Sequence, residues 1–347
     1  MSKKKALQAL ANHSNMHTIT LAKEMDHEED YRQYVCNGHA LVGSDYGRRH
    51  GHGHERYGSI RCGIKSPSTT ILRIPVMMTE REKWHFDLHG YVILRNIISK
   101  SDVDHMVKRC DEWQALPDAE LPPPMSTAGG YPPAKNASRA IINPDFVDSV
   151  YADLQLNNEI MRIVLTLTDN CPQHLQCALI QNTSECTDGG LHNGAEGGIR
   201  NPANDYQAVD GRVFATFINA GISLVDVPQG AGFVCVPGSH KSQFAAPDDL
   251  TSYSDPPSVV NLPINAGDCV VFTELLRHGA RKWTLDTPRQ TVFCRYVTSY
   301  ASWSPGNGPI EEHRGLLSDD LYELKQMAGF QTRKKVVDKA LARLDRN

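Results

Sequence analysis

The sequence predicts a mainly β protein with flanking helices, built around a closed or two-sheet core of the jelly-roll type, as in cupins. After Pro172, short segments rich in valine, isoleucine and phenylalanine alternate with glycine, proline and asparagine turns, a pattern typical of sandwiches and barrels. Before and after this region, apolar residues recur at helical spacing. The predicted strands are Leu175–Gln181, Val213–Ile218, Ile222–Val227, Gly232–Val236, Ser258–Leu262, Asp268–Leu275 and Thr291–Val297.

The first helices are predicted just ahead of the β region. Thr79 to His89 has the pattern of a helix that Gly90 ends, and the apolar run from Tyr91 to Arg95 follows as a strand. Ser99 and Asp102 then form a capping pair before a further helix. This order predicts a helix packed on a sheet.

Longer helical patterns lie on both sides of the strands. Residues 145 to about 168 are predicted as one helix, because their apolar positions fall three and four apart. Beyond Pro309 the chain returns to helix, with a start signal at Ser318. The segment from Arg333 to Leu344 is basic and amphipathic, so we expect a surface helix.

At 347 residues the chain is long enough for one sizeable core with an extension. Residues 1–78 are polar, rich in histidine and glycine and weakly periodic, and the tract His50-Gly-His52-Gly-His54 has the composition of a mobile loop. We expect the catalytic domain at 79–310 and a helical tail at 311–347. The prolines and glycines of 122–133 predict a long loop, and with the insert at 195–212 this loop is expected to set substrate specificity.

Composition excludes some classes of partner. The formal net charge is -4, which offers no basic field for nucleic acid. The nine cysteines are scattered without a CxxC pair, so we expect buried, reduced thiols. No apolar run approaches the ~18 residues of a membrane span. The N-terminus has a basic start, but its apolar part breaks at Asn12-His13 and is too short for a signal peptide. These features predict a cytoplasmic protein and leave its oligomeric state open.

Two histidines carry the chemistry that the sequence predicts. His192 lies between glycines in a strand-like region, His278 follows a later strand, and Arg289 comes after it on the next predicted antiparallel strand. Imidazole suits iron(II), and a guanidinium holds a carboxylate through two parallel hydrogen bonds. This combination is what a non-haem iron(II) site that uses 2-oxoglutarate requires.

Residues from about Trp84 to Trp303 resemble the phytanoyl-CoA dioxygenase family of iron(II)/2-oxoglutarate oxygenases. The Pro-Gly-Ser-His-Lys and Ala-Gly-Asp elements, in this order, are the most specific part of the likeness. The matching pieces are His-Gly-Tyr-Val-Ile-Leu-Arg at 89–95, His192, Gly-Phe-Val-Cys-Val-Pro-Gly-Ser-His-Lys-Ser at 232–242, Ala-Gly-Asp-Cys-Val-Val-Phe-Thr-Glu at 266–274, His278-Gly279 and Arg289.

The resemblance implies a double-stranded β-helix in which His192 and His278 bind Fe(II) and Arg289 anchors the distal carboxylate of 2-oxoglutarate. Thr291 lies two residues beyond Arg289, on the same face of a strand, so its hydroxyl is expected to assist. Family chemistry adds dioxygen as co-substrate and oxidation of an aliphatic C–H bond. The substrate is expected to be a small molecule or an acyl compound.

One position departs from the family pattern. The first motif of the family is His-x-Asp, where the aspartate completes a face of two histidines and one carboxylate, but here the residue after His192-Asn is Gly194. Glu196 is one candidate replacement, although an extended strand from 192 to 196 would span roughly 13 Å, so the chain would have to curl back. Gly194 therefore decides which chemistry the site performs.

Two other interpretations arise from Gly194. His-x-Gly resembles the pattern of iron(II)/2-oxoglutarate halogenases, in which chloride or bromide takes the open position. Alternatively, iron binding is lost and the jelly roll serves as a catalytically silent binding protein. The leading prediction is a hydroxylase-type dioxygenase, with halogenation and silence as the alternatives.

Overall fold

The structure is a computed structural model that describes residues 77–128, 137–194, 204–242, 244–255, 258–301 and 311–346. Contacts divide the chain into Met1–Thr69 and Thr70–Asn347, and every described residue belongs to the second unit. The predicted histidine tract at 50–54 lies outside the described residues, as does most of the predicted extension at 1–78.

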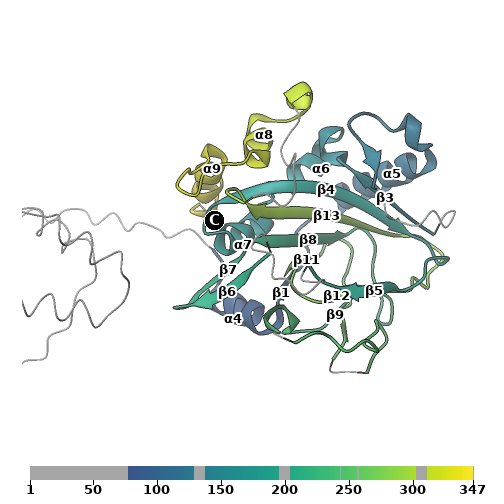
Figure 1. Ribbon diagram of the computed structural model, residues 1–347. Coiled ribbons are helices and arrows are strands. Elements are labelled where there is room, and N and C mark those ends of the chain that lie inside the picture. Colours follow the sequence, from purple (N-terminus) through teal and green to yellow (C-terminus); the bar gives the residue numbers. More distant parts are fainter. Residues whose placement is uncertain are drawn as a thin grey trace, which may run out of the picture. The chain divides into compact units, whose positions relative to one another are not determined.

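Antiparallel strands form the core in two main sheets. The larger has the order β1-β11-β8-β13-β4-β3-β2 and the smaller β10-β9-β12-β5, and Figure 1 shows the smaller below the larger. A separate hairpin joins β6 to β7. The predicted jelly-roll fold is confirmed. The strands are β1 Tyr91–Leu94, β2 Ser126–Thr127, β3 Ser138–Ile142, β4 Pro172–Asn182, β5 Gly189–His192, β6 Tyr206–Val209, β7 Arg212–Ala215, β8 Phe217–Ser223, β9 Gly232–Cys235, β10 Val260–Asn261, β11 Cys269–Thr273, β12 His278–Arg281 and β13 Arg289–Thr298.

One pair of predicted strand boundaries is wrong. The stretch Asn219-Ala-Gly221 was expected to separate two strands, but it lies in the middle of β8, and the break falls instead at Thr216. Gly221 is opposite Phe293 of β13, and a Cβ added there would lie 3.0 Å from the Phe293 ring. This glycine therefore makes room for a cross-strand aromatic ring and does not mark a turn.

The helices surround the sheets, and most of them lie along the larger one (Figure 1). Gly90 ends α4 with a φ of 83°, and the Ser99 side chain accepts a hydrogen bond from the Asp102 amide at the start of α5, as predicted. The helices are α4 Glu80–His89, α5 Lys100–Ala115, α6 Ser149–Leu154, α7 Asn158–Leu167, α8 Asp319–Lys325 and α9 Lys335–Leu344, with short 3₁₀-helices at Asp118–Glu120, Pro144–Phe146, Ser239–Lys241 and Glu311–Leu316.

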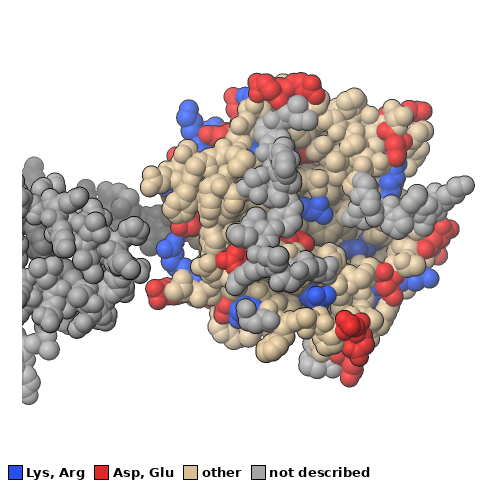
Figure 2. All heavy atoms as spheres, in the orientation of Figure 1, with Lys and Arg blue, Asp and Glu red and all other residues tan. Residues whose placement is uncertain are grey.

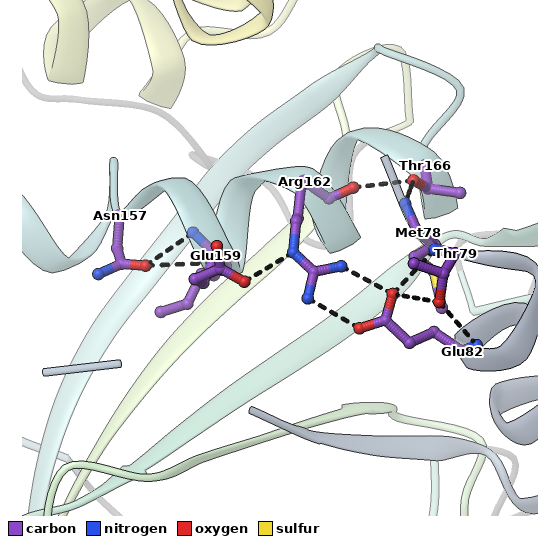
Figure 3. Close-up of polar contacts among 8 residues, drawn as sticks. Met78, Thr79, Glu82, Asn157, Glu159, Arg162 and Thr166 are labelled. Atoms are coloured by element: carbon purple, nitrogen blue, oxygen red, sulfur yellow. Dashed lines mark hydrogen bonds and ion pairs between the residues drawn. The ribbon is translucent and has the colours of Figure 1, made fainter. Parts of the chain in front are cut away.

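The single helix predicted over 145–168 is wrong, because the chain forms α6 and then α7. Asn157 separates them: its side-chain oxygen accepts from the amides of Glu159 and Ile160, at 2.9 and 3.3 Å, and so starts a new helix (Figure 3). Asparagine is a strong N-cap. The spacing of apolar residues continues across Asn157 and therefore did not indicate the break.

Arg162 of α7 holds the start of α4 (Figure 3). Its two terminal nitrogens donate to the two carboxylate oxygens of Glu82, at 2.8 and 2.7 Å, and its Nε donates to Glu159 at 2.7 Å. Glu82 also accepts from the amide of Thr79, which closes a capping box. Burial alone would raise the pKa of Glu82, but the hydrogen bonds from Arg162 and Thr79 hold that pKa below its ordinary value.

The C-terminal helices pack into the main core. The predicted amphipathic helix is α9, and it buries Val336, Val337, Ala340 and Leu341 against α7 and α8. α8 contacts β4 of the larger sheet and begins at Ser318, whose side chain accepts from the Leu321 amide as predicted. Among the described residues, none of the helices is long and apolar enough to cross a bilayer.

Seven cysteines fall within the described residues, and all are free thiols. Six of them are buried, as predicted, and Cys171 is half-buried. Burial raises the pKa of Cys235 to about 12, so this thiol stays protonated at neutral pH. The described cysteines therefore contribute packing volume.

Lys334, just before α9, is buried and makes stability depend on pH. Its Nζ donates to the carbonyls of Pro172, Leu324 and Gln326, at 2.9, 2.9 and 2.5 Å, and burial lowers its pKa from 10.5 to about 8. Between these two values the unfolded chain holds a proton that the folded chain has lost, so the contribution of Lys334 to stability grows with rising pH. We expect the unfolding free energy of the wild type, minus that of Lys334→Met, to increase from about pH 8 to about pH 10. Urea unfolding measures this gap, and a constant gap would contradict the prediction.

Candidate active site

His192 and His278 lie opposite each other on neighbouring strands. β5 pairs with β12 in a register that places the two residues side by side, and their ring centroids are 4.3 Å apart. His192 is exposed, whereas His278 is only 9% exposed. The two histidines singled out in the sequence therefore come from distant parts of the chain and converge on one place.

Both rings are fixed in the same tautomer. Nδ1 of His192 is 3.0 Å from the carbonyl oxygen of Gly190, and Nδ1 of His278 is 2.6 Å from that of Leu276. A carbonyl can only accept, so each Nδ1 carries the proton and each Nε2 keeps its lone pair. A backbone carbonyl that orients a ring in this way is the usual support of a metal-binding histidine.

Burial sets the charge of His278. It lowers the pKa of this ring to about 3, and the nearby His192 and Arg295 act in the same direction, although the hydrogen bond to Leu276 opposes them. The imidazole is therefore neutral at neutral pH, which is the form that binds a metal.

A carboxylate that the sequence prediction missed completes the cluster. Ligand atoms of His192, Glu274 and His278 all lie within 4.8 Å of one another. Glu274 follows β11 directly, and its Oε2 accepts a hydrogen bond of 2.6 Å from Nδ2 of Asn219 on β8. The only signal in the sequence was a glutamate shortly before His278, at the end of a buried strand.

Side chains occupy the space beside Gly194, where one of the three interpretations placed an open position. The amide of Gly194 donates to the Glu274 carbonyl at 3.1 Å, and a Cβ added at Gly194 would lie 1.9 Å from Nδ2 of Asn204 and 3.0 Å from Cγ of Glu274. Glycine is needed here because these two side chains occupy the space. Glu196, the expected replacement ligand, lies outside the described residues.

Arg289 and Thr291 share a cavity with the cluster. The cavity has a volume of about 810 Å³ and is lined by His192, Glu274, His278, Arg289 and Thr291. Arg289 and Thr291 are 9% and 5% exposed. They lie two residues apart on β13 and therefore share the face that points inward, as predicted.

The two residues reach this cavity from different sheets. β12 and β13 do not pair, because His278 belongs to the smaller sheet and Arg289 to the larger. The cavity is enclosed from both sheets, and strand order in the sequence did not reveal this separation.

Aromatic side chains line much of the remaining wall. They are Phe217, Phe233, Phe272, Phe293 and Trp283. Figure 2 shows basic side chains within the hollowed part of the face turned to the viewer. Residues 129–133 of the loop and 195–203 of the insert that are expected to set specificity lie outside the described residues. The described part of the site is thus an apolar chamber with a few charged groups.

Comparisons with known proteins agree with this architecture. The family model described as phytanoyl-CoA dioxygenase (PhyH) matches residues 86–291. Among solved structures, HygX from Streptomyces hygroscopicus with nickel and 2-oxoglutarate bound is 18% identical, with a TM-score of 0.55 over 69% of this chain and 94% of that one. HygX with iron bound is 16% identical, with a TM-score of 0.54 over 76% and 99%.

A weaker likeness, with a TM-score of 0.49 and 18% identity over 74% of this chain and 93% of the other, is to the epimerase SnoN from nogalamycin biosynthesis. Comparison with curated proteins gives no match. The likeness to HygX supports the jelly-roll fold, and the family match covers more than half of the chain. The chain belongs to the phytanoyl-CoA dioxygenase family, whose enzymes use Fe(II), 2-oxoglutarate and dioxygen.

Proposed function

We propose that this chain hydroxylates an aliphatic C–H bond of a small molecule, with His192, Glu274 and His278 as the metal ligands. The observation that carries the proposal is the cluster of these three ligand atoms within 4.8 Å of one another. Two imidazoles and one carboxylate are the donor set typical of non-haem iron(II) oxygenases.

The described residues fit such an ion. Each histidine offers an unprotonated Nε2, because its Nδ1 proton is directed at a backbone carbonyl. Asn219 donates to one oxygen of Glu274 and so orients the carboxylate. When bound, Fe(II) with 2-oxoglutarate and dioxygen supplies the oxidising power to break a C–H bond, with succinate and carbon dioxide as co-products. The chain itself contributes binding, orientation and a largely apolar enclosure.

Arg289 and Thr291 suit the distal carboxylate of 2-oxoglutarate. A guanidinium binds a carboxylate through two hydrogen bonds, and its attraction is stronger in a buried site than in water. Within the described residues, Oγ1 of Thr291 is buried without a hydrogen-bond partner, so a bound carboxylate oxygen would satisfy it. Both residues face the same cavity as the proposed metal ligands.

The structure favours hydroxylation over the two alternatives. Halide binding by a halogenase needs a free position where the aspartate is missing, but Asn204 and Glu274 occupy the space beside Gly194, and Glu274 offers the carboxylate. A silent binding protein has no need of two histidines held in the tautomer that binds metal. With Glu274 as the carboxylate ligand, the donor set would be that of a hydroxylating oxygenase, and the bound group would supply oxygen to the substrate.

An anaerobic titration tests the proposal. The purified chain should bind one Fe(II), and 2-oxoglutarate should then produce the weak visible charge-transfer band of its chelate with iron. Chloride and bromide should leave the affinity for 2-oxoglutarate unchanged. His278→Ala should lose the band, whereas His105→Ala should keep it, because His105 pairs with Asp148 on the surface. A wild type without the band would overturn the assignment, and a band sharpened by halide would favour halogenation.

A further inference from the structure

We propose that Arg295 and Gln176 form a second anion site in the cavity and bind a carboxylate of the substrate. The inference rests on the proposed function, because it names the class of substrate for the same site. The substrate would then be a small carboxylic acid with an apolar body. The site is separate from the one that holds 2-oxoglutarate.

Arg295 lies near the three proposed metal ligands. On β13 it shares a face with Arg289 and Thr291, and all three line the cavity. Across the sheet it pairs with Asn219 of β8, the residue that donates to Glu274. A ligand held by Arg295 would therefore lie within reach of the cluster.

The Arg295 guanidinium has no acidic partner among the described residues. One terminal nitrogen donates to Oε1 of Gln176, directly across on β4, and Phe293 lies under the guanidinium with its ring centroid 6.0 Å away. A half-buried cation without a counter-ion is costly, so an anionic ligand would stabilise it. Because Gln176 uses its oxygen toward Arg295, its amide nitrogen remains a further donor for a planar carboxylate.

Arg289 and Arg295 lie far apart on β13 and contact different parts of the cavity wall. Positions 289 and 295 are six residues apart (295 − 289 = 6), or about 20 Å along a strand. Arg295 is directed across the sheet to Gln176, and Nε of Arg289 is 3.5 Å from the position of a Cβ built at Gly232 of the smaller sheet. The two guanidinium groups thus approach different walls of the cavity, and we assign them to different carboxylates.

The cavity walls indicate what the acid carries. Phe293 lies on β13 with Arg295, and Phe217 lies on the neighbouring strand β8. Phe233, Phe272 and Trp283 line the cavity from other strands and a loop. Aromatic walls favour an apolar body, because its burial removes apolar surface from water. The fixed carboxylate would orient this body so that one C–H bond faces the metal cluster.

The test compares matched acids and amides. Hexanoate and 3-phenylpropanoate, their primary amides and hexyl phosphate are titrated calorimetrically, first into the metal-free chain and then into the anaerobic chain with Fe(II) and 2-oxoglutarate. We expect the acids to bind at least about tenfold more tightly than the amides. Arg295→Gln should abolish this preference and leave the 2-oxoglutarate band intact, and Arg295→Lys should keep part of it.

Arg281→Gln is the matched control, because it also removes one positive charge from the cavity. Its Nε donates to the Ser252 carbonyl and its guanidinium stacks on Tyr253, so the preference for acids should survive. Equal binding of acids and amides, no binding of any probe, or tighter binding of hexyl phosphate would overturn the carboxylate site. So would an Arg295→Gln variant that loses 2-oxoglutarate. If instead the wild type prefers acids but never gives the band, the proposed function fails and the anion site stands.

Discussion

Replacing Glu274 by glutamine is expected to lower the affinity for Fe(II) by at least about 100-fold and to abolish turnover of 2-oxoglutarate. Loss of an outer-shell partner of a metal ligand typically costs about 10- to 100-fold, and loss of the anionic ligand itself costs more. The amide keeps the size of the side chain and its contact with Asn219, so the change is mainly one of charge. Anaerobic Fe(II) titration gives the affinity, and succinate formation gives the turnover.

Variants at Asn219 and Gly194, which both lie next to Glu274, distinguish loss of a metal ligand from loss of packing. Asn219→Ala removes the donor that orients Glu274, so iron affinity should fall by about tenfold while binding persists. Gly194→Asp alone should destabilise the fold and gain no affinity, because its Cβ would lie 1.9 Å from Nδ2 of Asn204. Combining Gly194→Asp with Asn204→Gly and Glu274→Ala returns a carboxylate to the usual family position, and part of the iron affinity should return. Unchanged affinity in Glu274→Gln would mean that the carboxylate comes from elsewhere.

Glu274 could not be identified from sequence spacing alone. Its place beside His192 depends on the pairing of β11 with β8 and of β5 with β12, and these pairings join residues far apart in the chain. The histidines were predictable because glycine-flanked and strand-end histidines match a known family pattern. A missing aspartate at 194 was visible, but the residue that we propose as the carboxylate ligand, Glu274, was not.

The fold itself was largely predictable where local signals agree. The C-terminal end of α4 and the N-terminal end of α5 are set by capping residues, Gly90 and Ser99, which can be recognised in the sequence. The break between α6 and α7 was missed because apolar spacing continues across Asn157. The segment from Arg333 to Leu344 was expected to form a surface helix. The extent of its burial depends on contacts of α9 with α7 and α8 that local periodicity does not encode.

Replacing Asp145 by asparagine is expected to destabilise the fold by about 3–5 kcal/mol, the usual cost of leaving a buried charge without its partner. Asp145 lies in the turn Pro144–Phe146, and its Oδ2 is 2.7 Å from Nζ of Lys325 at the end of α8. The Asp145 and Lys325 side chains are 0% and 5% exposed. Among the described residues, neither Asp145 oxygen meets a donor at hydrogen-bond angles, so charge attraction holds the pair. Urea unfolding measures the loss.

The same ion pair explains why α8 is part of the folded core. Burial, followed by the positive charge of Lys325, keeps the pKa of the adjacent His174 well below its usual value, so this neutral ring cannot replace the lysine as a cation. Asp145→Leu combined with Lys325→Met should recover most of the lost stability, since an apolar pair of similar size needs no desolvation of charge. Breaking the exposed pair Lys100–Asp104 by Lys100→Ala should cost less than about 1 kcal/mol. If Asp145→Asn cost no more than that control, the pair would not hold the C-terminal helices to the sheet.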